Sequence, residues 1–124
     1  MIWLLIGIGG GLGAMARHAL NSALSARYAS FPVGIFVINV LGCLAIGLIA
    51  GLVATGRHHL SEHTRTFLVV GVLGGFTTFS TFGLDTFTLL RGGHSAFAVI
   101  NAAGQVVAGV LAVWIGFALG LGRF

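Results

Sequence analysis

The chain has 124 residues, of which 57% are hydrophobic and only 6% are charged, and its formal net charge is +4. Soluble domains carry about 25% charged residues, so a soluble fold of this length could not cover its surface with so few charges. The composition therefore excludes a soluble domain and requires lipid around the protein. The arginines occur singly, with no basic run and no interleaved aromatic residues, which argues against a nucleic-acid partner.

Four stretches without charge lie between the charged residues, at 1–16, 28–56, 66–84 and 92–122. A transmembrane helix needs roughly 20 apolar residues. The last three stretches are long enough, and the first must continue past Arg17 to span the bilayer. We therefore predict an all-α membrane protein with one domain over residues 1–124 and with transmembrane helices at about 2–23, 32–54, 66–89 and 96–121.

The first predicted helix has features of two other kinds of segment. It lacks a basic n-region, and Gly9–Gly13 replaces the leucine-rich centre of a signal peptide, so we do not expect it to be cleaved. The spacing Gly9-x-Gly11-x-x-Ala14 imitates a dinucleotide-binding turn, which needs an acid about 20 residues further on. The first acid in the chain is Glu62. We therefore expect these glycines to pack helices.

Pairs of glycines at helical spacing recur along the chain, at Gly7 and Gly11, Gly9 and Gly13, Gly47 and Gly51, Gly71 and Gly75, and Gly116 and Gly120. Such G-x-x-x-G pairs let helix backbones approach closely in lipid. Four helices of this length have no room to pack together and also enclose a pore. A conduit would have to lie between helix faces or between subunits, which favours an oligomer.

The polar loop between the second and third helices contains His59-Leu-Ser-Glu62-His63, which matches the inverted zinc-protease signature H-x-x-E-H. A zinc protease needs this motif on a helix of a catalytic domain, together with a third ligand. The only other acid in the chain is Asp85. We therefore expect a solvated loop and no enzyme.

The arginines are divided evenly between the two sides of the membrane. With successive loops on alternate sides, three fall near one side and three near the other: Arg17, Arg27 and Arg91 against Arg57, Arg65 and Arg123. Orientation follows the side with excess Lys and Arg, and neither side has an excess here. We expect insertion in both orientations; the alternative is that weaker cues select one.

Three amide side chains lie inside the predicted helices. Asn39 is in the second helix, and Asn101 and Gln105 are one turn apart in the fourth. Leaving a buried amide unpaired costs roughly 1–3 kcal/mol, so such groups face a partner helix or a wet pathway. Together with the hydroxyls of the third helix and with Arg17, they form a track of hydrogen-bond donors, which suits an anion.

The segment GGFTTFSTFGLD (74–85) is a poor place to continue a helix, because two glycines are followed by Thr77 and Thr78. A broken helix is tolerated in the membrane where its backbone is buried or lines a cavity, and the freed carbonyls can coordinate a cation. Phe79 and Phe82 then share one face of the resuming helix. Aromatic ring edges are positive, so they would weakly attract an anion.

This segment resembles the helix 3 signature of the Fluc/CrcB family of bacterial fluoride channels. GGGLGAMARH (9–18) is similar to the family pattern G-G-x-x-G-A-x-x-R-Y, and FPVGIFVINVLGC (31–43) is similar to P-x-G-T-x-x-x-N. The match covers all four helices in order and length. The resemblance implies a fluoride-specific channel in the inner membrane of a bacterial cell, through which fluoride leaves passively.

The resemblance also implies an antiparallel dual-topology homodimer with a broken third helix, two fluoride pores and a central sodium ion that is structural and not transported. The backbone carbonyls of Gly74 and Thr77 would hold this sodium, doubled to four by a two-fold axis. Phe79 and Phe82 would line the pores and Asn39 would donate to the ion. The rest of the expected pathway comprises Arg17 near an entrance, with Asp85 as a candidate partner, and Ser80, Thr81, Asn101 and Gln105.

Several residues depart from the family pattern. His18 replaces Tyr, Ile35 replaces Thr, and Asp85 replaces Glu. Asn101 and Gln105 stand where members tend to carry Tyr and Ser or Thr. The alternatives are a small dual-topology multidrug exporter, which needs a glutamate deep in the first helix, and a non-transporting membrane assembly protein.

Overall fold

The computed structural model describes residues 1–56 and 59–123, and its regular structure is helical throughout. Residues 57, 58 and 124 lie outside the described part, so the predicted place of Arg57 is not described. The elements in chain order are α1 (Ile2–Ser25), α2 (Val33–Ala54), α3 (Glu62–Arg65), η1 (Thr66–Leu73), α4 (Gly74–Phe76), α5 (Phe79–Arg91) and α6 (Ser95–Leu121). Elements α3 to α5 follow one another along a single span, Glu62–Arg91.

The described chain has four helices that are long and apolar enough to cross a membrane. Three of them agree with the predicted ranges to within two residues at each end, and the third begins four residues earlier than predicted, at Glu62. The reason is a capped start: the Ser61 hydroxyl accepts a hydrogen bond from the Thr64 N–H at 3.1 Å, which satisfies a donor of the first turn. The chain is therefore a multi-pass membrane protein.

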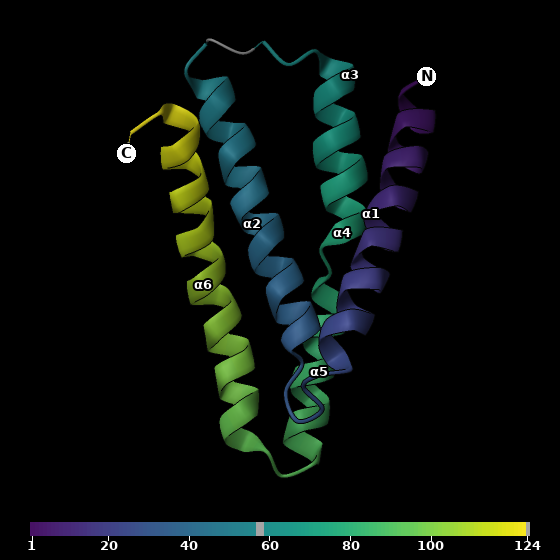
Figure 1. Cartoon of the computed structure of the whole chain (residues 1–124), viewed down its shortest axis with the longest axis vertical. Helices are drawn as coiled ribbons and strands as arrows, with labels where there is room; N and C mark the ends of the chain where they lie inside the picture. Colours follow the sequence, from purple (N-terminus) through teal and green to yellow (C-terminus); the bar gives the residue numbers. More distant parts are fainter. Residues whose placement is uncertain (57–58, 124) are drawn as a thin grey trace.

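The helices pack as two close pairs, α2 with α6 and α1 with the η1–α4 half of the third span (Figure 1). Glycines make the close contacts. A Cβ on Gly47 would collide with the Val113 carbonyl of α6, and one on Gly13 would collide with the Val72 carbonyl of η1. Four of the five predicted G-x-x-x-G pairs lie in these contacts. The exception is Gly7 and Gly11, where a Cβ would meet no atom of the described residues within 4 Å.

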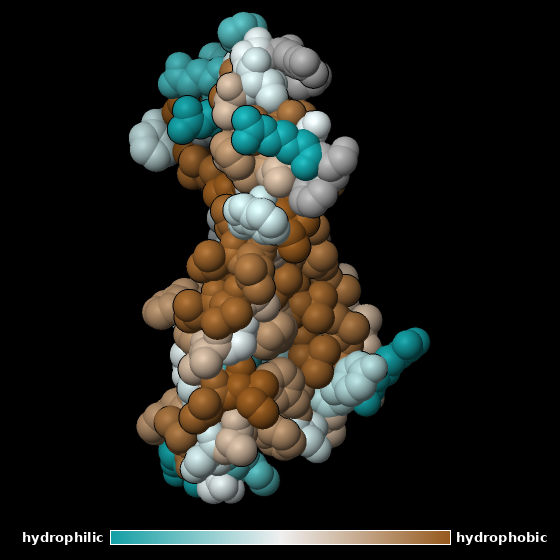
Figure 2. Space-filling model, turned by 90° about the vertical axis from the view of Figure 1, so that its left-hand side faces the viewer, coloured by the Kyte–Doolittle hydropathy of each residue, from teal (hydrophilic) through white to brown (hydrophobic). Residues whose placement is uncertain are grey.

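The two pairs of helices lie close together only at one end. In Figure 1 they converge where α5, the start of α2 and the end of α1 meet, and they diverge toward the end that carries both termini. The surface between the polar ends is apolar, as Figure 2 shows for one face. Arg27 and Arg91 lie at the converging end, and Arg65 and Arg123 lie at the other.

The third span is interrupted locally, at two residues. Thr77 and Thr78 have extended backbones, with φ/ψ of −83°/158° and −152°/121°. The axis of the joined helix bends by only 17°. The backbone therefore leaves the helix for two residues while α5 continues in nearly the direction of α4.

Candidate functional site

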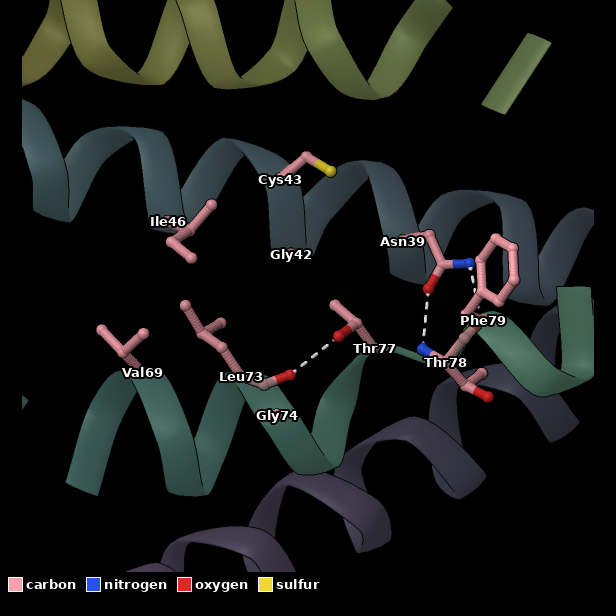
Figure 3. Close-up of a pocket in the computed structure, with 10 residues that line it drawn as sticks. All are labelled: Asn39, Gly42, Cys43, Ile46, Val69, Leu73, Gly74, Thr77, Thr78 and Phe79. Atoms are coloured by element: carbon pink, nitrogen blue, oxygen red, sulfur yellow. Dashed lines mark hydrogen bonds between the residues drawn. The ribbon is translucent and has the colours of Figure 1, made fainter. Parts of the chain in front are cut away.

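The interruption of the third span is held by one side chain from another helix. The Thr78 N–H donates to Asn39 Oδ1 at 2.9 Å, and Asn39 Nδ2 donates back to the Thr78 carbonyl at 3.1 Å (Figure 3). An amide side chain thus pairs with both backbone groups of one residue, as a neighbouring strand would. Thr78 is only 8% exposed, so without Asn39 its backbone would be left unpaired in a dry environment.

The hydroxyls of the signature segment cap the helix that resumes after the interruption. The Thr78 side chain is the N-cap of α5 and accepts from the Thr81 N–H at 3.3 Å. The same hydroxyl donates to Thr81 Oγ1 at 3.1 Å and lies 3.2 Å from Ser80 Oγ. Ser80 and Thr81, both predicted pathway residues, therefore serve this cap in the structure.

These bonds remove the usual helical partners of two carbonyls. In a continuous helix the Gly74 carbonyl would accept from the Thr78 N–H, and the Thr77 carbonyl from the Thr81 N–H. Here the Thr78 N–H goes to Asn39 and the Thr81 N–H to the Thr78 hydroxyl. In the described part of the chain, the Thr77 carbonyl receives only a long hydrogen bond of 3.5 Å, from Arg17 Nη1.

Gly74 and Thr77 both line a groove of about 410 Å³ between α2 and the third span, which Figure 3 shows. Gly74 is exposed, and among the described residues a Cβ on it would meet only the Val69 carbonyl oxygen, at 3.7 Å. Carbonyl oxygens without helical partners, in an accessible groove, are the ligands that a hard cation takes at an unwound helix. The residues present therefore fit the predicted sodium site.

The predicted phenylalanine pair lies on the other side of the interruption. Phe79 and Phe82 have ring centroids 5.3 Å apart, with ring planes tilted by 42°. Together with Asn39, Gln105 and Val106 they line a cavity of about 150 Å³. Phe79 is 84% exposed, so one face of this cavity is open in a single chain. Four of the predicted pathway residues thus meet around one small space.

A chain of amides runs from this cavity into the contact between α5 and α6. Asn39 Nδ2 donates to Gln105 Oε1 at 2.7 Å, and Gln105 Nε2 donates to Asn101 Oδ1 at 2.9 Å. Asn101 Nδ2 then donates to Thr86 Oγ1 at 2.9 Å, and Thr86 donates to the Phe82 carbonyl at 2.8 Å. Asn101 is fully buried, with 0% exposure. Asn101 does not line the cavity itself and is linked to it by its hydrogen bond with Gln105.

Arg17 and Asp85 lie apart from the phenylalanine cavity. No ion pair joins them in the described part of the chain; Arg17 contacts Thr77 instead, across the contact of α1 with the third span. Asp85 lines a separate polar cavity of about 290 Å³, which Thr81 and Tyr28 also line. Its Oδ2 atom is buried without a hydrogen-bond partner among the described residues. The expected pairing of these two residues is thus absent from the single chain.

Two elements of the site were not foreseen from the sequence. Asn39 was predicted to donate to an ion, whereas both of its Nδ2 hydrogens are used, by Thr78 and by Gln105. Thr86 was not singled out at all, although it ends the amide chain. Its position one residue after Asp85 carries no distinguishing signal in the sequence, because its partner Asn101 is fifteen residues away.

Comparison with known proteins agrees with this architecture. Residues 4–117 match the model of a family described as CrcB-like protein, Camphor Resistance (CrcB). A relative from Chloroflexus aurantiacus, named "Fluoride-specific ion channel FluC", is 47% identical over 122 residues, which cover 98% of this chain and 94% of the relative. A relative of the same name from Paracoccus denitrificans is 43% identical, with 98% and 96% covered.

Proposed function

Because the chain belongs to the CrcB-like family, an ion-channel family and not a family of enzymes, we propose that it is itself a fluoride-specific ion channel. The observation that carries the proposal is the cavity beside the interrupted span. It places two phenylalanine rings and two amides around one small space within a transmembrane protein. Ring edges are positive, and so is an amide hydrogen that no protein group has taken up, so this lining suits a small anion.

The proposed assembly is an antiparallel homodimer in the inner membrane of a bacterial cell. Three features of the single chain favour it. Phe79 is almost fully exposed beside its cavity, the groove at Gly74 is open, and the arginines show no bias that would select one orientation. A second copy on this face would cover the apolar groove and close the open side of the cavity.

The proposed cofactor is a sodium ion at the centre of the dimer. The carbonyls of Gly74 and Thr77 would be its ligands, and a two-fold axis would supply four oxygens. The ion would supply a fixed positive charge between two anion paths. Within each chain, Asn39 and the Thr78 hydroxyl take up the N–H groups that would occupy these carbonyls in a continuous helix. The Thr77 carbonyl keeps only its long hydrogen bond from Arg17.

Fluoride would leave the cell passively, which lowers its cytoplasmic concentration. The test is an efflux assay on liposomes that contain the purified protein and are loaded with fluoride, with a fluoride electrode outside. Rapid fluoride release, with chloride retained in a parallel sample, is the expected result. Absence of fluoride release, or equal release of chloride, would reject a fluoride-specific channel. The alternative function, a small multidrug exporter, needs a glutamate in the first helix, and α1 contains none.

A further inference from the structure

The direction of the amide chain beside the cavity is set by the groups at its two ends. At one end, the backbone N–H of Thr78 can only donate, so Asn39 must turn Oδ1 toward it. At the other end, Thr86 spends its single hydroxyl hydrogen on the Phe82 carbonyl. The Thr86 oxygen can then only accept, so Asn101 must turn Nδ2 toward it.

Between these ends, Gln105 has one orientation that satisfies both neighbours. Its Oε1 accepts from Asn39 Nδ2, and its Nε2 donates to Asn101 Oδ1. Rotating the amide by half a turn would place two NH₂ groups together at Asn39 and two oxygens together at Asn101. Both hydrogen bonds would be lost in a region where unpaired polar groups are costly. The hydroxyl of Thr86 thus determines, through Asn101, which way the Gln105 amide faces.

The donors of the cavity can be counted group by group. Asn39 has no hydrogen left, because Nδ2 donates to Thr78 and to Gln105. Gln105 Nε2 spends one hydrogen on Asn101, and the described residues offer no partner for the second. The remaining lining side chains, Phe79, Phe82 and Val106, carry no N–H or O–H group. Gln105 therefore supplies the uncommitted side-chain donor of this cavity.

We infer that Gln105 is the residue that donates to the anion in this cavity, that Asn39 holds the interrupted backbone, and that Asn101 and Thr86 are positioning residues that lock the Gln105 amide in its donating orientation. The inference rests on the proposed function, because it assigns the donor of the same ion path. It also changes the expected role of Asn39, whose hydrogens are needed to hold Thr78 and Gln105.

The first experiment measures fluoride efflux for variants of Gln105. Gln105→Met keeps the length of the side chain and removes the amide, so flux should fall by about tenfold or more if one hydrogen bond to the anion is lost. Gln105→Glu is the sharper variant. A protonated glutamate can donate its one hydrogen to Asn101 and still accept from Asn39, so it keeps the chain of bonds and lacks only the spare hydrogen. It should lose flux to a similar extent.

The second experiment tests the positioning role of Thr86. Thr86→Val keeps the shape and removes the hydroxyl, and should lower fluoride flux by about threefold or more. Thr86→Ser keeps the hydroxyl and is the matched control, with flux close to wild type. If Thr86 acts through Gln105, Thr86→Val should cause no further loss in the Gln105→Met background. An equal further loss in that background would show that Thr86 serves packing alone.

Each variant is first checked for its elution as a folded species in detergent. Flux within about twofold of wild type in both Gln105 variants would overturn the assignment of the donor. The wild-type protein, measured in the same liposomes, distinguishes failure of the proposed channel function from failure of the assignment of Gln105. A silent wild type would reject the proposed channel, whereas a conducting wild type with conducting Gln105 variants would reject this inference alone.

Discussion

At the scale of single residues, the polar side chains of this protein hold its backbone. Asn39 lies in an otherwise apolar helix, and such an amide suggests contact with a passing ion. In the structure it pairs with both backbone groups of Thr78. Leaving either group unpaired would cost about 1–3 kcal/mol, so one asparagine makes a two-residue interruption of the third span tolerable.

The phenylalanine pair gives the most direct prediction at this scale. Phe79→Ile and Phe82→Ile should each abolish or strongly reduce fluoride flux, because aliphatic side chains have no positive ring edge. The change in packing should cost less than about 1.5 kcal/mol. Efflux from liposomes measures the result, and elution in detergent reports whether dimers form.

Phe87→Ile is the matched control for these two variants. Phe87 is on the same helix and is exposed, but it does not line the cavity. Its flux should stay close to wild type. If Phe79→Ile and Phe82→Ile also conduct normally, the two rings belong to the packing of the protein and not to its ion path.

At the scale of elements, neighbouring glycines of the third span have different tasks. A Cβ on Gly75 would collide with the Gly10 carbonyl of α1, so this glycine permits helix packing within the chain. A Cβ on Gly74 meets only the Val69 oxygen at 3.7 Å, an ordinary contact. Nothing in the described part of the single chain therefore requires a glycine at position 74, and a requirement there would come from a partner subunit or an ion.

This difference predicts distinct defects for two valine variants. Gly75→Val should destabilise the chain itself, with loss of folded protein, since backbone cannot move aside cheaply. Gly74→Val should leave the helical content unchanged, as measured by circular dichroism, and should disrupt dimer geometry and sodium binding together. Thr77→Ser keeps the carbonyl and the hydroxyl and should be mild. Normal dimers and full flux in Gly74→Val would argue against the proposed sodium site at the dimer centre.

At the scale of the whole molecule, the balance of arginines predicts the topology. Reporter fusions at the C-terminus should show comparable populations on both sides of the membrane, because neither side has an excess of positive charge. Adding two lysines to the loop after Gly56 should shift the population to one side and lower activity. Co-expression of an oppositely biased copy should restore activity. A wild-type chain found in one orientation only would refute the dual-topology dimer.

The proposed sodium ion predicts how transport responds to cation gradients. Fluoride flux should not scale with a sodium gradient, because the ion is a fixed part of the dimer. Replacing external sodium with a large organic cation should lower activity slowly, since release requires the interface to open. Liposomes with opposed sodium and fluoride gradients provide the measurement. Uphill movement of fluoride driven by sodium would identify a symporter.

The sequence by itself determined that this is a four-helix membrane protein, because lipid imposes a strong rule: each span must be about 20 residues long and nearly free of charge. It also predicted a broken third helix where two glycines precede two adjacent threonines. There the structure has two extended residues, Thr77 and Thr78, within a joined helix that bends by only 17°. The motif at residues 74–85 was sufficient to identify the family to which the chain belongs.

The tertiary structure decided which groups meet. Glycine spacing predicted close packing but could not say that α2 would pair with α6 and α1 with η1, because every G-x-x-x-G pair is equivalent in sequence. The orientation of the Gln105 amide depends on Thr78 and Thr86 of the third span, which act on it through Asn39 and Asn101. Hydrogen-bond direction is a property of such a connected set of groups, so only the folded chain determines which donor remains free.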